Sequence, residues 1–128
     1  MADYQAPLQQ MRFTIEHLAG FDEVKALPDY ETVDSDTVEA VLEEAARFAS
    51  GVLAPINWLG DRQGVRVVDD AVQVPAEFTD AYAKFCEGGW PGIAGNPEFG
   101  GQGLPKAVAV ACDEMWAAAN VSFALCPE

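Results

Sequence analysis

A glycine-rich run is the first group of residues in this chain that could carry out chemistry. Gly100-Gly101-Gln102-Gly103 invites comparison with loops that bind phosphate through their backbone N–H groups. A P-loop also needs Lys followed by Ser or Thr, and a dinucleotide-binding loop needs GxGxxG spacing after a strand. This run has neither feature. It therefore predicts a turn that requires positive φ and close backbone approach, with a backbone wall of a ligand cavity as the alternative.

The second group consists of ionisable and nucleophilic side chains, and their sequence neighbours do not suit catalysis. A general base needs a partner and a pocket, and the sequence indicates neither for His17. We therefore expect His17 to be a surface or helix-end histidine. Asp113 and Glu114 are adjacent on a predicted helix and point about 100° apart, which rules out a carboxylate pair. Ser50 and Ser122 lack a neighbouring base that would activate them. We therefore expect no catalytic residue within this chain.

The three cysteines, Cys86, Cys112 and Cys126, predict free thiols. Their number is odd, no CxxC motif occurs, and there is one histidine, which disfavours both a disulfide framework and a zinc site. Cys86 and Cys112 fall within apolar helical patterns, where cysteine behaves as a small hydrophobic residue. We expect a reducing, cytoplasmic environment and no metal site.

Composition narrows the possible partners. The 128 residues suit one domain, residues 1–128, and half of them are hydrophobic. The net charge of −14 disfavours nucleic acid and anionic membrane surfaces, because both attract clustered Lys and Arg. No secretory signal is visible, and no apolar run approaches the ~20 residues of a membrane span. A cytoplasmic protein without a membrane span or a nucleic-acid partner is expected.

Hydrophobic periodicity predicts the helices that must position these residues. Apolar residues recur at i, i+3 and i+4 over 7–18, 38–56, 78–85 and 108–119. The second helix should be capped by Asp34, Ser35 or Asp36, and Pro55 predicts a kink or an end near position 52. Trp58 is then expected to cover the core just beyond it. A further helix should begin at 121–122.

Only residues 64–75 have a β-like pattern. Two runs rich in valine flank Asp69-Asp70, which predicts a two-residue hairpin turn. One hairpin is not stable by itself, so we expect it to pack on the helices. The predicted fold is mainly α, an orthogonal helical bundle with one small β-hairpin.

Several segments, in this order and spacing, resemble one enzyme family. They are Tyr4-Gln5-Ala6-Pro7-Leu8, the runs 41–49 and 53–55, Gly60-Asp61-Arg62, Gly88-Gly89-Trp90-Pro91 and Pro97-Glu98-Phe99-Gly100-Gly101-Gln102-Gly103. Together they cover most of the chain. The chain resembles the N-terminal helical domain of the longer bacterial acyl-CoA dehydrogenases.

This resemblance implies an FAD-dependent oxidoreductase that desaturates an acyl-CoA thioester at its α and β carbons. In that family a carboxylate removes the α proton and FAD accepts hydride from the β carbon. The family fold adds a β middle domain and a helical C-terminal domain, and the flavin and acyl chain lie between the domains. The implied partners are those remaining domains, the acyl-CoA, an electron acceptor and further copies in a homo-oligomer.

The resemblance also implies site residues. The segment after the glycine-rich helix helps line the family's acyl cavity, and here it corresponds to Val121, Phe123, Ala124, Leu125 and Pro127. A phenylalanine at position 123 is bulky for a long acyl tunnel. No residue corresponds to the family's catalytic glutamate or its main flavin-binding motifs. The isolated chain is therefore expected to be inactive and not to bind FAD by itself.

Two hypotheses follow for the chain as a whole. Under the first, it is a fragment of a longer dehydrogenase, and Leu125 and the face of Trp116 are exposed for partner domains. Under the second, it is a stand-alone acidic helical module for protein interaction without enzymatic activity. Continuation into a β-rich domain would favour the first hypothesis.

Overall fold

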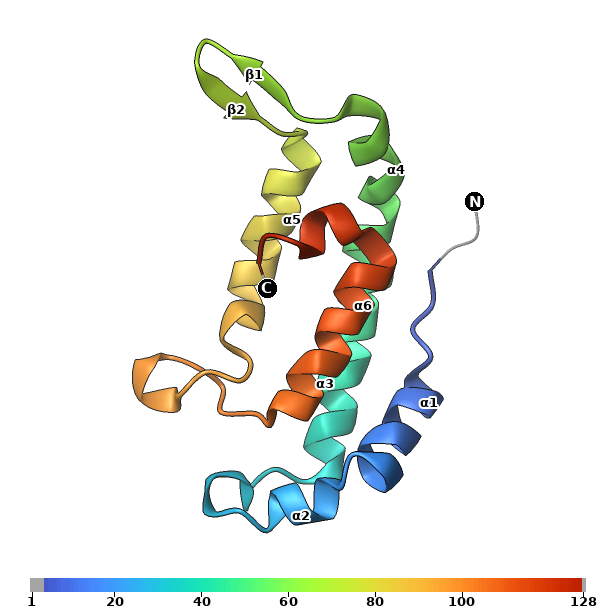
Figure 1. The fold of residues 1–128 in the computed structure, drawn as a ribbon, viewed down its shortest axis with the longest axis vertical. Coiled ribbons are helices and arrows are strands. Elements are labelled where there is room, and N and C mark those ends of the chain that lie inside the picture. Colours follow the sequence, from blue (N-terminus) through green and yellow to red (C-terminus); the bar gives the residue numbers. More distant parts are fainter. Residues whose placement is uncertain (1–3, 128) are drawn as a thin grey trace.

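The computed structural model describes residues 4–127, and helices account for most of them (Figure 1). Between them lie short π-helical and 3-10 turns and one antiparallel hairpin. The predicted mainly α fold with one small hairpin is confirmed. The elements are α1 (Leu8–Phe13), α2 (Phe21–Lys25), α3 (Ser35–Phe48), α4 (Ala54–Gln63), β1 (Arg66–Val68), β2 (Ala71–Gln73), α5 (Ala76–Glu87) and α6 (Lys106–Ala124).

The helix α3 begins where the sequence predicts. The side chain of Asp34 accepts a hydrogen bond from the backbone N–H of Thr37 at 2.7 Å, so Asp34 is the cap among the three candidates. The predicted apolar stripe is buried along this helix, at Val38, Leu42, Ala45 and Phe48. This stripe packs against α6, which runs beside α3 in Figure 1.

The predicted irregularity before Pro55 is a π-helical segment, Ala49–Leu53, that joins α3 to α4. Proline has no N–H group to donate, and a wider turn accommodates the missing hydrogen bond. The chain remains helical to Gln63 instead of ending near position 52. The expectation that Trp58 covers the core is wrong, because its side chain is 52% exposed and carries the Arg62 guanidinium 5.3 Å from its ring centroid.

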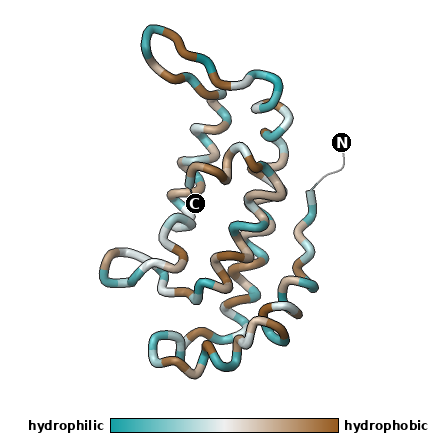
Figure 2. The backbone as a smooth tube through the Cα atoms, in the orientation of Figure 1, coloured by the Kyte–Doolittle hydropathy of each residue, from teal (hydrophilic) through white to brown (hydrophobic). Residues whose placement is uncertain are grey.

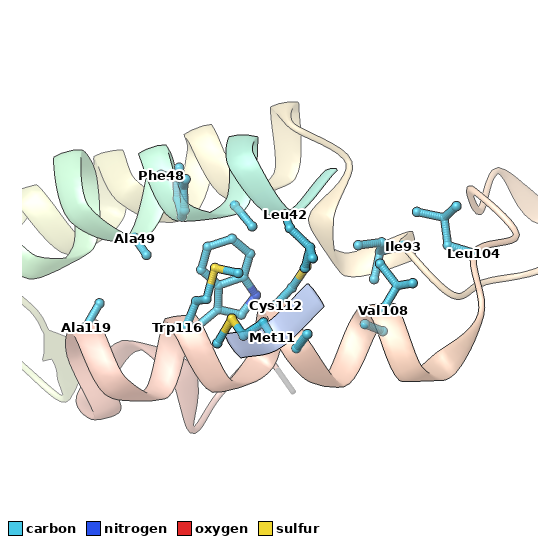
Figure 3. Close-up of a cluster of buried hydrophobic side chains, with 14 of the residues drawn as sticks. Met11, Leu42, Phe48, Ala49, Ile93, Leu104, Val108, Cys112, Trp116 and Ala119 are labelled. Atoms are coloured by element: carbon cyan, nitrogen blue, oxygen red, sulfur yellow. The ribbon is translucent and has the colours of Figure 1, made fainter. Parts of the chain in front are cut away.

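Residues of α6 occupy the centre of the core, among them Val108, Cys112, Met115, Trp116 and Ala119. Trp116 lies edge-on to three rings, with centroids 5.4 Å from Phe48, 5.9 Å from Phe85 and 5.1 Å from Trp90. Figure 3 shows its indole among the buried side chains between α6 and α3. The expectation of an exposed Trp116 face is therefore wrong, since the residue is 3% exposed.

The hairpin forms at the predicted residues but does not pack on the helices. Asp69 and Asp70 have φ of 50° and 59°, and Val68 pairs with Ala71, as in a type I′ turn. Every residue of both strands is exposed. The hairpin extends beyond the ends of α4 and α5 (Figure 1), and its hydrophobic residues are visible in Figure 2. The prediction that it packs on the helices is wrong.

Candidate functional site

The glycine loop, residues 95–103, connects the turn after α5 to α6. Gly100 has φ of +85°, a backbone conformation that residues with a Cβ rarely adopt. A Cβ on Gly101 would lie 2.2 Å from the carbonyl carbon and oxygen of Gly95, so the backbone segments at Gly95 and Gly101 are in direct contact. The predicted turn with positive φ and close backbone approach is confirmed.

Hydrogen bonds within the loop occupy the N–H groups that a phosphate would need. The N–H of Gly101 donates to Asn96, that of Gln102 to Gly92 and that of Gly103 to Gly95, at 3.1, 2.8 and 2.9 Å. The Gln102 side chain also donates to the carbonyl of Gly89 at 2.9 Å. The loop is therefore a rigid connection, and these three donors do not point toward a bound anion.

A cavity of about 450 Å³ opens beside this loop. Its lining is largely polar and comes from the 3-10 turn Pro28–Tyr30, the residues after it, and the loop itself. No Lys or Arg belongs to this lining, and Asp29 adds a carboxylate. A flavin diphosphate would not suit it, because two phosphates need positive charge or free N–H donors. The lining residues are Asp29, Tyr30, Thr32, Val33, Ala94, Gly95, Asn96, Pro97, Gln102 and Gly103.

A second cavity, of about 350 Å³, lies between α1 and the first half of α6. Its walls are mostly apolar, from Met11, Ile15 and Val110, and Glu114 adds one carboxylate.

The hydroxyl of Tyr4 is buried without a hydrogen-bond partner. Burial, and then the charge of Glu114, raise the pKa of Tyr4, so this phenol stays neutral at physiological pH.

The five residues that the resemblance implies for a cavity wall fall into two groups. Val121 and Leu125 are 53% and 74% exposed and lie four residues apart at the end of the helical region. Phe123 and Ala124 are buried, and the Phe123 ring centroid is 5.6 Å from that of Phe85. Pro127 is half-buried. The five side chains therefore do not converge on one surface of this chain.

Sequence reasoning missed Asn120, which is 1% exposed and interrupts α6. Its φ of −160° and ψ of 88° are not helical, and Phe123 donates its N–H to Asn120 Oδ1 at 3.1 Å. Asn120 is thus an internal N-cap, and the helix predicted to begin at 121–122 is confirmed. The missed signal is an asparagine after three alanines, because asparagine is among the best capping residues.

The remaining candidates occupy structural positions. His17 is exposed, with Nε2 3.9 Å from Glu16, as predicted for a surface histidine. All three cysteines are free, and burial raises the pKa of Cys112 to about 12. Cys86 is exposed and Cys112 is buried, so the expected role of a small hydrophobic residue fits Cys112 but not Cys86. Within residues 4–127, no three His, Cys, Asp or Glu side chains gather as a metal site would require, and no helix is long and apolar enough to span a membrane.

Comparison with known proteins identifies two relatives that match nearly the whole chain. The 3-methylmercaptopropionyl-CoA dehydrogenase of Ruegeria pomeroyi is 40% identical over 124 residues, which is 97% of this chain and 21% of that protein. The broad-specificity linear acyl-CoA dehydrogenase FadE5 of Mycobacterium tuberculosis is 29% identical over 123 residues, or 94% of this chain and 20% of that protein. No protein-family model matches the chain.

The chain spans about one fifth of the length of both relatives. The resemblance that the sequence predicts is confirmed, and the chain is related, over nearly its whole length, to a segment of the acyl-CoA dehydrogenases.

Proposed function

We propose that this chain is the N-terminal helical domain, residues 1–128, of an FAD-dependent acyl-CoA dehydrogenase. The observation that carries the proposal is 40% identity over 97% of the chain to a protein named as an acyl-CoA dehydrogenase. The chain matches about one fifth of that protein, which fits one domain of a larger enzyme. The parent protein is then an oxidoreductase, and this domain is not catalytic by itself.

The proposed role of the domain is to form part of the wall of the acyl and flavin cavity. Val121 and Leu125 are apolar and exposed, so they can contact an acyl chain. Phe123 and Ala124 are buried in the core, where they hold the segment from behind. On this assignment Phe123 does not narrow the tunnel, and the exposed pair sets the shape of the wall.

The proposed substrate is an acyl-CoA thioester, and the names of the two relatives both specify a CoA ester. FAD, when bound, would accept a hydride from that substrate. The polar cavity beside the glycine loop does not suit the flavin diphosphate, so its principal contacts would come from other domains. The contribution of this chain is to orient the acyl group and to exclude water from it.

The remaining partners belong to the same proposal. The other domains of the polypeptide would cover Leu125, and an electron acceptor would reoxidise the flavin. A cytoplasmic homo-oligomer is the expected form. These proposals rest on the resemblance and on the two relatives.

Substitution at the proposed wall tests the role of the domain. Val121→Trp in the complete enzyme should lower kcat/KM for long linear acyl-CoAs several-fold more than for short ones. The matched control is Val110→Trp, because Val110 is also 53% exposed on α6 but lies in its first half. The panel should include 3-methylmercaptopropionyl-CoA beside linear acyl-CoAs. Equal effects of the two substitutions on chain-length preference would contradict the proposal.

A further inference from the structure

The strongest unexplained feature of the chain is a break inside α6. The helix is regular from Lys106 until Asn120, whose backbone leaves the helical region, and it then resumes to Ala124. A polar side chain that is 1% exposed costs free energy unless its hydrogen-bonding groups are satisfied. Among the described residues, Asn120 is the only polar residue that is buried.

Both ends of the Asn120 amide have a specific partner. Nδ2 donates to the backbone carbonyl of Leu53 at 3.2 Å, 67 residues earlier in the chain. Oδ1 accepts from the N–H of Phe123 at 3.1 Å, which closes the first turn of the last helical segment. The Asn120 side chain therefore holds residues 121–124 in a set direction relative to Leu53, which lies in a different helical segment.

The partner of Asn120, Leu53, also lies where the regular α-helix is interrupted. Leu53 is fully buried and is the last residue of the π-helical segment that precedes Pro55. The π-helical segment between α3 and α4 and the break in α6 are thus joined by one hydrogen bond. The side chain of Asn120 thus connects two interruptions of α-helix that lie 67 residues apart in the sequence.

We propose that Asn120 is the positioning residue for the terminal segment, residues 121–127. Its two hydrogen bonds turn the chain away from the axis of α6, which buries Phe123 and leaves Val121 and Leu125 exposed. That this exposed pair faces an acyl chain rests on the proposed function. The positioning itself does not.

Alanine at position 120 removes both hydrogen bonds and favours a continuous helix, since alanine has the highest helix propensity. The terminal segment would then follow the axis of α6. Aspartate keeps an oxygen that can accept from Phe123 but, when ionised, cannot donate to Leu53. Asn120→Ala should therefore redirect the segment, and Asn120→Asp should loosen its attachment to the π-helical segment between α3 and α4.

The chain carries its own reporters for this test. Cys86 near the end of α5 and Cys126 in the terminal segment are exposed, whereas Cys112 is buried. With spin labels on Cys86 and Cys126 of the 128-residue chain, pulsed electron paramagnetic resonance measures the distance between the two labels. The matched control is Asn96→Ala, because Asn96 makes the same kind of capping bond, to Glu98 N–H at 2.8 Å, in the glycine loop.

We expect a displaced distance distribution in Asn120→Ala, a broadened one in Asn120→Asp, and no change in Asn96→Ala. Unchanged distributions in both position-120 variants would overturn the proposal, and so would an equal change in the control. If Asn120→Ala does not fold, as judged by circular dichroism, Asn120→Asp decides by the same criterion.

A second measurement separates this inference from the proposed function. In the complete enzyme, Asn120→Asp should change the ratio of kcat/KM between long and short acyl-CoAs several-fold. A displaced segment with an unchanged ratio would support the positioning role and contradict the wall assignment. An unchanged segment would contradict the positioning role whatever the enzyme does.

Discussion

Substitution of Gly101 by alanine should destabilise the fold through lack of space. The new Cβ would lie 2.2 Å from the Gly95 carbonyl, where ordinary contact is 3.4–4 Å. The neighbouring atoms are backbone, so the backbone segments at Gly95 and Gly101 must separate by about 1 Å or more. That movement strains the Gly101–Asn96 and Gly103–Gly95 hydrogen bonds, worth about 1 kcal/mol each, and adds steric strain. We expect a loss of about 2–3 kcal/mol.

Two other glycines provide controls of graded severity. Gly100 has positive φ but open space around its Cβ position, so Gly100→Ala should cost about 1 kcal/mol. Gly51 has open space and lies in the π-helical segment, so Gly51→Ala should stabilise the fold by about 0.5–1 kcal/mol.

Urea unfolding at pH 7, followed by tryptophan fluorescence, measures the three free energies. The urea midpoint of Gly101→Ala should fall by about 1–2 M, given typical slopes for domains of this size. A Gly101→Ala variant as stable as Gly100→Ala would refute the reasoning, because the lack of space at Gly101 is the reason for its larger expected loss.

Three further predictions concern charge, thiols and the hairpin. The hydrogen bond from Thr37 lowers the pKa of Asp34 below its ordinary 3.8, so its contribution is present above about pH 4 and lost as pH falls through the folded value. In urea unfolding, Asp34→Ala should therefore be less stable than wild type at pH 7, with the difference shrinking below pH 4; a constant difference would contradict this. Cys112 should react with a thiol reagent at pH 8 only after unfolding, since burial raises its pKa to about 12; rapid reaction in the folded chain would show that the core is open. The double variant Val67→Thr, Val72→Thr should change stability by less than about 0.5 kcal/mol, because both side chains are about 70% exposed; a larger loss would mean that the hairpin packs on another surface.

The helices were predictable because their signals are local. The apolar stripe of α3 and the cap at Asp34 depend on residues within a few positions of each other. The position of Trp58 was not predictable by the same means. The expectation assumed a kink or an end near position 52, but the chain stays helical to Gln63, and Trp58 lies on an exposed position of α4 while Leu53 remains buried.

Errors at the hairpin and at Trp116 have a different origin. Hairpin residues with a strand pattern carry no signal that says which surface covers them, and here no described residue does so. Whether a tryptophan on an apolar helix faces the core or a partner depends on long-range neighbours. Trp116 is enclosed by Phe48, Phe85 and Trp90, from three separate parts of the chain.

The candidate site was predictable only through resemblance. Val121 and Leu125 are exposed at the end of α6, but their types and spacing alone would indicate any apolar contact surface. The role of Asn120 depends on a carbonyl 67 residues away, and no sequence pattern specifies that pairing. Tertiary structure is required to distinguish a buried cap from an exposed one.

The most direct test of the central claim is an intact mass and a visible absorbance spectrum of the protein purified from its natural source. A mass several-fold above the 13.7 kDa of this chain, with the absorbance of bound flavin, is the predicted result. A protein of 13.7 kDa without flavin would contradict the claim and favour a stand-alone interaction module.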